Sequence, residues 1–413
     1  MVQMSKSIFS SSLRLIRLIS PFKSPNYGRM MSTTTVSGLN NPSPCLILPP
    51  TFDDGSDDMI YNMYNIAQNK VLKFNNKKLL PEEVTRIVGS SHGWLALLDE
   101  RNHDLILTNP ITRRHVKLPS YKGNPFSSFR VIISCDAEQE ECQAMMIYRA
   151  SLKYCRLGRS PTEWTPLGAR MCAPPITYMT RDYKDLVYSS RHNLLFCIVN
   201  ATYHYEFEAW DVAYNPPRLH WQNREDLDAK RLCRDKNLLP AKTCLWCDTF
   251  RYLVFAEQTD QLFYVTRHIV PQMALDGSAM KDLAKDSYPY KTISFDVHKV
   301  DWKSGGEGGR LSHLDGGSLD GLAMFVGVNH SFAVLATEDN GLKPNSIYFT
   351  NDKALIPDKD LFPKEWIDWK QGDHDIGIFD YENKTISSFY DHCDLQNYKR
   401  VTAEPVWFTP SHN

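Results

Sequence analysis

Cysteine is the residue type whose spacing in this chain most resembles a chemical site. The chain has ten cysteines, and two of them form its one C-x-x-C motif, Cys244-Leu245-Trp246-Cys247. A structural zinc site needs a second pair of ligands at a suitable spacing, and none follows. A thioredoxin-type motif opens a helix, whereas residues 243–255 read as a strand that places the two cysteines on opposite faces. We therefore predict neither a metal nor a redox role for this motif.

Four short runs have the composition of ligand-binding sites. The acidic runs are Asp53–Asp58 and Asp373-His374-Asp375, and the glycine-rich runs are Gly305–Gly309 and Gly316–Asp320. The first acidic run lacks the spacing and the closing glutamate of an EF-hand. Neither glycine run has the order of a phosphate-binding loop or of a nucleophile elbow. We interpret all four as turns, in which the aspartates remain solvated.

The histidines show no spacing that suggests a catalytic triad. His204 and His268 are isolated, and His92 precedes Gly93-Trp94. In that tripeptide, glycine is suited to a tight turn, and the indole of Trp94 is suited to filling space between packed sheets. The sequence therefore predicts no catalytic, cofactor-binding or metal-binding residue, and we expect a protein that is not an enzyme and carries no cofactor.

The elements that surround these residues read as short strands separated by turns. Residues 86–119 contain four strand candidates joined by tight turns. A similar alternation of strand candidates and turns recurs over 129–167, 176–222, 243–302 and 322–390. Such units must stack around a ring to bury their faces, so the pattern predicts an all-β fold, a β-propeller of six or seven four-stranded blades. We expect the ring to be closed by strands from both ends of the chain. Candidates are Cys45–Leu48 or Met59–Tyr64 with Val406–Phe408. Helical content should be low, with Asp276–Lys285 the best candidate.

The first 52 residues differ from this body because they contain no acidic residue. Five cations lie there, at Lys6, Arg14, Arg17, Lys23 and Arg29. On a helical wheel, the apolar residues of 6–19 gather on the face opposite the cations. An acid-poor, serine-rich, cationic amphipathic leader is typical of a mitochondrial or chloroplast transit peptide.

This leader predicts an organellar address and a domain order. We expect a disordered or helical cleavable transit peptide at 1–31, a linker at 32–44 and the propeller at 45–413. The arginines and the amphipathic helix favour the mitochondrion, and the run Ser32–Thr35 keeps the chloroplast as an alternative. A location in the cytosol or nucleus is the less favoured alternative.

Charge and hydropathy exclude two classes of partner. The formal net charge is −1, and removal of the leader cations would leave about −6, which argues against a general nucleic-acid binder. No apolar run approaches the ~18 residues that span a bilayer, so we predict no transmembrane segment.

Several short motifs together resemble a known family. They are Ser91–Leu95, Leu107–Thr112, Tyr252–Phe255, Asn345–Thr350 and Pro405–Ser411. In this order they resemble the plant KIB-type β-propeller found in many F-box proteins, over about residue 45 to the end. The resemblance implies a propeller without known catalytic residues that binds a protein target.

The region before residue 90 departs from the F-box members of that family. It leaves no room for an F-box helical set before Cys45-Leu46-Ile47-Leu48-Pro49, which already resembles the start of the propeller. The chain is similar to the organelle-targeted members without an F-box. We predict a non-enzymatic organellar propeller that binds a protein partner, and the sequence leaves open the identity of that partner and the oligomeric state of this chain. The alternatives are a substrate receptor of a ubiquitin ligase in the cytosol or nucleus, and an enzyme with its site in the propeller channel.

Overall fold

The structure is a computed structural model, and it describes most of the propeller body. The described residues are 43–52, 58–77, 85–99, 102–121, 129–148, 150–158, 163–168, 182–201, 204–225, 248–271, 290–303, 311–314, 316–351, 375–389 and 405–410. They all belong to one compact unit, residues 36–413. The transit peptide predicted at 1–31, the helix predicted at 276–285, Cys244-Leu245-Trp246-Cys247 and Gly305–Gly309 lie outside them.

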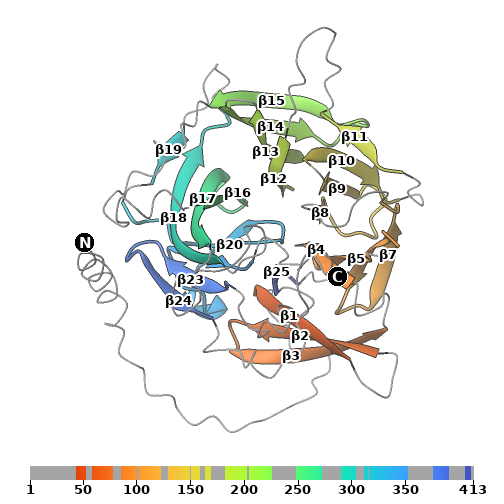
Figure 1. Cartoon of the computed structure of the whole chain (residues 1–413), viewed down its shortest axis with the longest axis horizontal. Coiled ribbons are helices and arrows are strands. Elements are labelled where there is room, and N and C mark those ends of the chain that lie inside the picture. The colour runs from red at the N-terminus through yellow and green to blue at the C-terminus, as the bar shows by residue number, and fades with distance from the viewer. Residues whose placement is uncertain are drawn as a thin grey trace, which may run out of the picture. The chain divides into compact units, whose positions relative to one another are not determined.

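The described strands form six blades that follow one another around a ring (Figure 1). Blade 1 consists of β25 (Val406–Phe408), β1 (Cys45–Phe52), β2 (Asp58–Asn65) and β3 (Lys70–Lys77). Blade 2 consists of β4 (Thr85–Ser91), β5 (Trp94–Asp99), β6 (Leu105–Asn109) and β7 (Arg114–Leu118). Blade 3 consists of β8 (Phe129–Ile133), β9 (Gln143–Tyr148), β10 (Ser151–Arg156) and β11 (Thr165–Leu167).

Blades 4 to 6 continue the order. Blade 4 consists of β12 (Asp182–Ser189), β13 (Leu194–Ala201), β14 (His204–Asp211) and β15 (Arg218–Glu225). Blade 5 consists of β16 (Asp248–Ala256), β17 (Gln261–Pro271), β18 (Tyr290–Val300) and β19 (Leu311–His313). Blade 6 consists of β21 (Phe332–Leu335), β20 (Leu322–Val326), β22 (Ser346–Phe349), β23 (Gly377–Asp380) and β24 (Thr385–Ser388). The prediction of an all-β propeller is confirmed.

Strands from both ends of the sequence close the ring, as predicted. The short strand β25 pairs antiparallel with β1, with Cys45 opposite Phe408 and Ile47 opposite Val406. Backbone hydrogen bonds between the first and last strands therefore complete blade 1 and hold the ring closed. Without β25, the inner edge of β1 would expose unpaired backbone groups.

The core lies between neighbouring blades, since each sheet is apolar on both faces. Trp94 of blade 2 is 2% exposed and belongs to a cluster with Val131 and Ile133 of blade 3. Its predicted position between blades is therefore confirmed. Another cluster joins Leu46 and Trp407 of blade 1 to Phe325 of blade 6 across the closure. Aromatic residues suit these flat interfaces because large rings cover much area between sheets.

Two glycines of blade 2 meet separate backbone requirements. The β4–β5 turn is formed by His92 and Gly93, with φ of 50° and 79°, as a two-residue type I′ hairpin turn requires. A Cβ on Gly89 would lie 1.8 Å from the Val131 carbonyl oxygen of the neighbouring inner strand. The inner strands of blades 2 and 3 can approach this closely because Gly89 has no side chain.

Blade 6 departs from the regular pattern of blades 2 to 5. Its strands β20 and β22 run parallel, and β21 adds to the other edge of β20. One further bridge, Phe255 with Phe332, connects β21 in parallel to the inner strand β16 of blade 5. This arrangement reverses the direction of β20 relative to β16.

Some boundaries differ from the sequence predictions. Strands β3 and β19 were not predicted, because polar residues occupy much of Lys70–Lys77 and β19 has only three residues. The predicted strand Leu322–Val328 ends at Val326, where Gly327 has a φ of 153°. Within the described part of the chain, no helix has the length and hydropathy needed to cross a membrane.

Candidate functional site

The inner strands of blades 2 to 5 end on the same side of the ring, which we call the mouth face. The Ser91 hydroxyl at the end of β4 accepts a hydrogen bond from the Ile133 N–H at the end of β8, at 2.9 Å. The Glu257 carboxylate after β16 accepts one from the Ser190 N–H after β12, at 2.7 Å. Turns from several blades therefore meet on the mouth face, where propellers commonly carry their variable loops.

The segment Gly327–Ser331, between β20 and β21, lies in the centre of the ring, and we call it the axial segment. Val328 belongs to a core cluster of blades 1 and 2. The axial segment also makes hydrogen bonds to blades 2, 3 and 4, through the pairs His330 with Ser90, Gly327 with Arg130 and His330 with Tyr188. The chain itself therefore occupies the centre of the propeller.

A buried ion pair lies beneath the axial segment. Arg130 on β8 pairs with Asp185 on β12, and Asp185 is fully buried. The Arg130 guanidinium also donates to the Gly327 carbonyl at 2.8 Å, and Asp185 accepts from the Leu253 N–H of β16 at 2.7 Å. Four blades thus share this one pair. Both charges are hydrogen-bonded, as burial requires.

His330 of the axial segment is a neutral hydrogen-bond acceptor. Its Nε2 accepts the Tyr188 backbone N–H at 2.9 Å, so this nitrogen carries no proton and the Nδ1 must carry one. Burial lowers the pKa of His330 to about 3, and the neighbouring His92 and Arg130 act in the same direction. Protonation would add a charge and would also remove the acceptor.

His92 lies beside His330 at the mouth face. The two imidazole rings are stacked with centroids 6.1 Å apart, and the His92 ring meets the Tyr188 ring edge-on at 6.4 Å. Burial lowers the pKa of His92, while the nearby Asp136 carboxylate opposes this effect. The His92 Nε2 atom is buried and has no hydrogen-bond partner in the described part of the chain. A bound group could supply that partner.

Tyr188 and two cysteines complete what we call the mouth cluster: His92, Cys135, Cys142, Tyr188 and His330. The pKa of Tyr188 is raised to about 12, chiefly by burial and also by negative charge on Cys135. The Tyr188 hydroxyl donates to the Asn193 side chain at 3.0 Å. In the described residues, no hydrogen bond joins either cysteine sulfur to His92 or His330. Without such a bond, the mouth cluster lacks the geometry of a cysteine–histidine nucleophile.

Further buried polar atoms without a partner lie next to the mouth cluster. They are the Ser189 and Ser331 hydroxyl oxygens and the Asn329 side-chain oxygen, from residues that are fully buried, and their lack of a partner holds for the described ranges of the chain. Ser189 directly follows Tyr188, and the other two flank His330 in the axial segment. Native proteins leave few buried polar atoms unsatisfied, so their concentration here marks the centre of the mouth face as the best candidate for a functional site.

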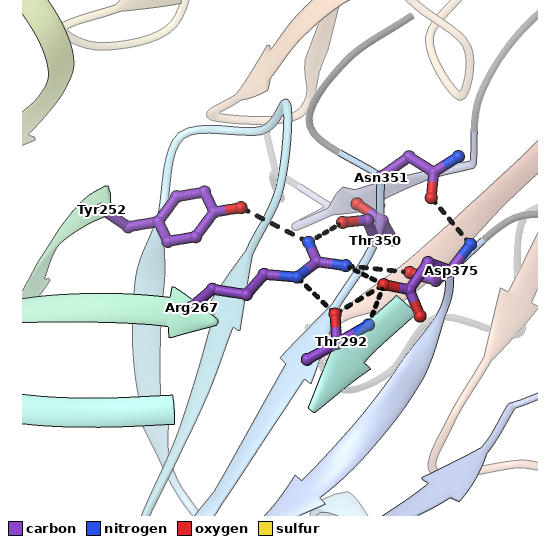
Figure 2. Close-up of polar contacts among 6 residues, drawn as sticks. All are labelled: Tyr252, Arg267, Thr292, Thr350, Asn351 and Asp375. Carbon is purple, nitrogen blue, oxygen red and sulfur yellow. Dashed lines mark hydrogen bonds and ion pairs between the residues drawn. The ribbon is translucent and has the colours of Figure 1, made fainter. Parts of the chain in front are cut away.

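Blades 5 and 6 share a second polar group, which we call the Arg267 joint (Figure 2). Its members are Tyr252, Arg267, Thr292, Thr350, Asn351 and Asp375. The buried Arg267 guanidinium donates to the Thr350 carbonyl at 2.6 Å and to the Asp375 carboxylate at 2.9 Å. Asp375 also accepts from the Thr292 N–H at 2.7 Å and from the Thr292 hydroxyl at 2.5 Å.

The Arg267 joint corrects one sequence prediction. Asp375 was expected to be a solvated turn residue, but it is 7% exposed and carries the main ion pair between blades 5 and 6. Its backbone N–H also donates to the Asn351 side chain at 2.8 Å. Arg267 lies 108 positions away in the sequence, so no local spacing could have revealed the pair.

Blade 5 carries a further pairing that the sequence did not suggest. His268 on β17 lies 2.8 Å from the Asp296 carboxylate on β18, and His313 on β19 lies 3.8 Å from the same carboxylate. The sequence separation of 28 residues between His268 and Asp296 conceals their position on neighbouring strands. Among the described residues, no group of three or more His, Cys, Asp or Glu side chains has the arrangement of a metal site.

The remaining sequence candidates are dispersed. Gly316–Asp320 forms a turn, as predicted, in which the Asn345 side chain accepts the Leu319 N–H at 2.8 Å. His204 begins β14 of blade 4, far along the chain from the turn that holds His92. Of Asp53–Asp58 and Asp373–Asp375, the structure describes only Asp58 and Asp375. Of the single residues considered from sequence, only His92 therefore belongs to the mouth cluster.

Three solved structures that match the chain resemble it weakly. Hydrazine synthase from Kuenenia stuttgartiensis has a TM-score of 0.32 and 10% identity, over 72% of this chain and 74% of that chain. The Dos1 propeller has a TM-score of 0.31 and 9% identity, over 61% and 67%. A chain of the nidogen/laminin complex has a TM-score of 0.30 and 9% identity, over 63% and 86%. These scores are too low to carry an argument about function.

Sequence comparison is more specific. No curated protein matches the chain. The family model described as the KIB1-4 beta-propeller matches residues 63–380, a span that runs from β2 in blade 1 to the end of β23 in blade 6. The predicted resemblance is therefore confirmed, and the chain belongs to the KIB1-4 β-propeller family.

Proposed function

We propose that this protein is a non-enzymatic protein-binding module of an organelle, and that it binds its partner on the mouth face. The observation that carries the proposal is a continuous series of polar contacts that ties the mouth-face turns together. It consists of Ser91 with Ile133, Gln143 with Val212, Ser190 with Glu257 and Lys299 with Asp320, joining blades 2 to 6 in order. A surface fixed in this way loses little conformational entropy when a partner binds.

Exposed apolar side chains on the mouth face give a partner something to bury. Tyr214, in the turn between β14 and β15, is 46% exposed, and Leu335, at the end of β21, is 44% exposed. The Arg218 guanidinium lies 4.2 Å from the centre of the Tyr214 ring. Tyrosine and arginine are enriched where proteins bind one another, because they combine large apolar area with polar atoms.

One observation favours the alternative of an enzyme site in the channel, and another argues against it. His92, His330 and Cys135 do converge near the axis. The axial segment, however, fills the centre, and His330 uses its free nitrogen lone pair on the Tyr188 backbone. The axial segment and His330 are therefore better suited to hold the ring together than to activate a nucleophile in the channel.

Site-specific photo-crosslinking tests the proposed binding face. A photoreactive phenylalanine analogue replaces Tyr214 or Leu335, and a third variant carries it at Lys73, which is exposed on the outer strand β3. After irradiation in isolated organelles, we expect the same discrete product from the first two positions and none from Lys73. A product from Lys73 alone would contradict the proposal. So would an unchanged product when the analogue stands at one of Tyr214 and Leu335 and glutamate replaces the other.

The organellar part of the proposal rests on the acid-free leader and is tested separately. A fluorescent protein at the C-terminus is imaged with the full chain and with a chain lacking residues 1–31. We expect the full chain to co-localise with a mitochondrial marker and the truncated chain to remain outside. A plastid signal would favour the chloroplast instead. A cytosolic or nuclear signal from both chains would contradict the proposed organellar location.

A further inference from the structure

Two cysteines of the mouth cluster lie opposite each other where the β8–β9 hairpin opens. The register of β8 and β9 pairs Ile133 with Ala144. It continues by one step, because the Ser134 N–H donates to the Gln143 carbonyl at 2.9 Å. The next opposed positions are Cys135 and Cys142.

This register brings the two side chains together. Opposed residues in an antiparallel pair alternate between hydrogen-bonded and non-hydrogen-bonded positions, and the Ser134–Gln143 bond makes the next pair non-hydrogen-bonded. At such positions the Cα atoms are about 4.5 Å apart, which is within the range that a disulfide bridges. The Cys142 Sγ also lies 3.3 Å from the Cys135 carbonyl oxygen.

The surroundings make the two thiols chemically different. The Cys142 thiol hydrogen-bonds to Cys135, which lowers the pKa of Cys135 and raises the pKa of Cys142. Asp136 and Glu141 partly oppose the lowering at Cys135. Cys135 is half-buried, whereas Cys142 is buried. A reagent from solvent would therefore reach Cys135 first, and Cys142 is placed to react with it second.

We propose that Cys135 and Cys142 form a reversible redox site that is oxidised by a small disulfide such as glutathione disulfide. The Cys135 thiolate attacks one sulfur of glutathione disulfide, which forms a mixed disulfide and releases one glutathione thiolate. The Cys142 sulfur then attacks Cys135, and its proton leaves with the second glutathione as a thiol. Two electrons pass from the protein thiols to glutathione disulfide, and reduced glutathione reverses both steps.

The other described thiols lack this arrangement. Burial raises the pKa of Cys45 and of Cys155 to about 12, and Cys197 is fully buried in the core between blades 3 and 4. The Cys135–Cys142 loop is itself hydrogen-bonded, because the Gln139 N–H donates to the Asp136 carbonyl at 3.0 Å and the Cys142 N–H donates to the Gln139 carbonyl at 3.1 Å. The hairpin can therefore present the two sulfurs to each other without rearranging the sheet.

The test uses the full chain, purified reduced and equilibrated at a series of glutathione to glutathione disulfide ratios. Free thiols are then alkylated, and the protein is cleaved after glutamate without reduction. Because Glu138, Glu140 and Glu141 separate the cysteines, cleavage yields two peptides that stay linked only if the disulfide has formed. We expect the linked pair to appear as the disulfide fraction rises and to vanish on return to reduced glutathione.

Variants distinguish the proposed order of attack. Cys142→Ser should retain a mixed disulfide with glutathione at Cys135, and Cys135→Ser should leave Cys142 unmodified. The control Cys155→Ser should form the linked pair as the unchanged protein does. The proposal is overturned if the natively folded protein, checked by circular dichroism, keeps both thiols free in excess glutathione disulfide. A stable mixed disulfide at Cys135 in the unchanged protein would also overturn it.

Discussion

The Arg267 joint and the mouth cluster are both polar groups shared between blades, yet they differ in how completely their atoms are partnered. In the Arg267 joint, Thr292 and Thr350 accept hydrogen bonds from the Arg267 guanidinium, and Asn351 accepts one from the Asp375 N–H (Figure 2). Both charged groups are thereby partnered, and among the described residues only the Thr350 hydroxyl of the joint is buried without a partner. In the mouth cluster, His92 Nε2 and the neighbouring Ser189 and Ser331 hydroxyls are buried without a partner among the residues that the structure describes. The first arrangement is suited to stability alone, whereas the second leaves atoms available for binding or reaction.

Removing the cation of the Arg267 joint should have the largest effect. In Arg267→Ala, the buried Asp375 carboxylate loses its counterion, and we expect the free energy of unfolding to fall by about 3–5 kcal/mol. Chemical denaturation under reducing conditions measures this. The double variant Arg267→Met, Asp375→Leu removes both charges and should recover much of the loss. A decrease below about 1 kcal/mol in the single variant would contradict the assignment of the joint as a stability element.

Acidification should weaken the mouth cluster through His330. The folded-state pKa of His330, about 3, lies below the ordinary value of 6.5. As the pH falls below that ordinary value, His330 becomes protonated in the unfolded chain but stays neutral in the folded chain. The stability contributed by neutral His330 is therefore present above about pH 6.5 and falls by about 1.4 kcal/mol per pH unit below it.

The variant His330→Gln isolates this effect. It retains an acceptor for the Tyr188 N–H but has no titrating group. Between about pH 7 and pH 5, we expect the unchanged protein to lose about 2 kcal/mol more than the variant. Carboxylates and other histidines contribute to both proteins and cancel in the difference. Parallel pH profiles for the two proteins would show that His330 does not titrate in this way.

The smallest effect is expected for His92→Asn. His92 occupies the first position of a type I′ turn before glycine, and Asn-Gly is a preferred pair for that turn, so stability should change by only about 0.5 kcal/mol in either direction. The ring contacts with Tyr188 and His330 would nevertheless be lost. If partner crosslinking at Tyr214 then weakens, the mouth cluster supports binding. A large loss of stability would instead make it a structural element like the Arg267 joint.

The sequence predicted most of the fold because the controlling signals are local. His92-Gly93 requires a tight turn, Trp94 requires a large apolar space, and Val406–Phe408 reads as a strand without a neighbour in the sequence. Each of these could be interpreted from a few residues. Polar outer strands such as Lys70–Lys77 were missed, because one face of such a strand is exposed and its apolar alternation is weak.

The candidate site could not be predicted in the same way. Cys135 and Cys142 are close in sequence, and their opposition follows from the β8–β9 register, so hairpin pairing could have revealed them. His92, Tyr188 and His330 come from three blades, and only ring closure brings them together. Asp375 was predicted to be solvated because its partner Arg267 is distant in the sequence.

By itself, the sequence determined the family, the all-β architecture and the acid-free leader, since these depend on composition and short-range pattern. The tertiary structure decided that the axial segment fills the ring and that the mouth-face turns are tied from blade to blade. It also decided which charges are buried. The physical reason is that a propeller stacks similar blades, so its distinctive chemistry arises where blades distant in the sequence meet around a common axis.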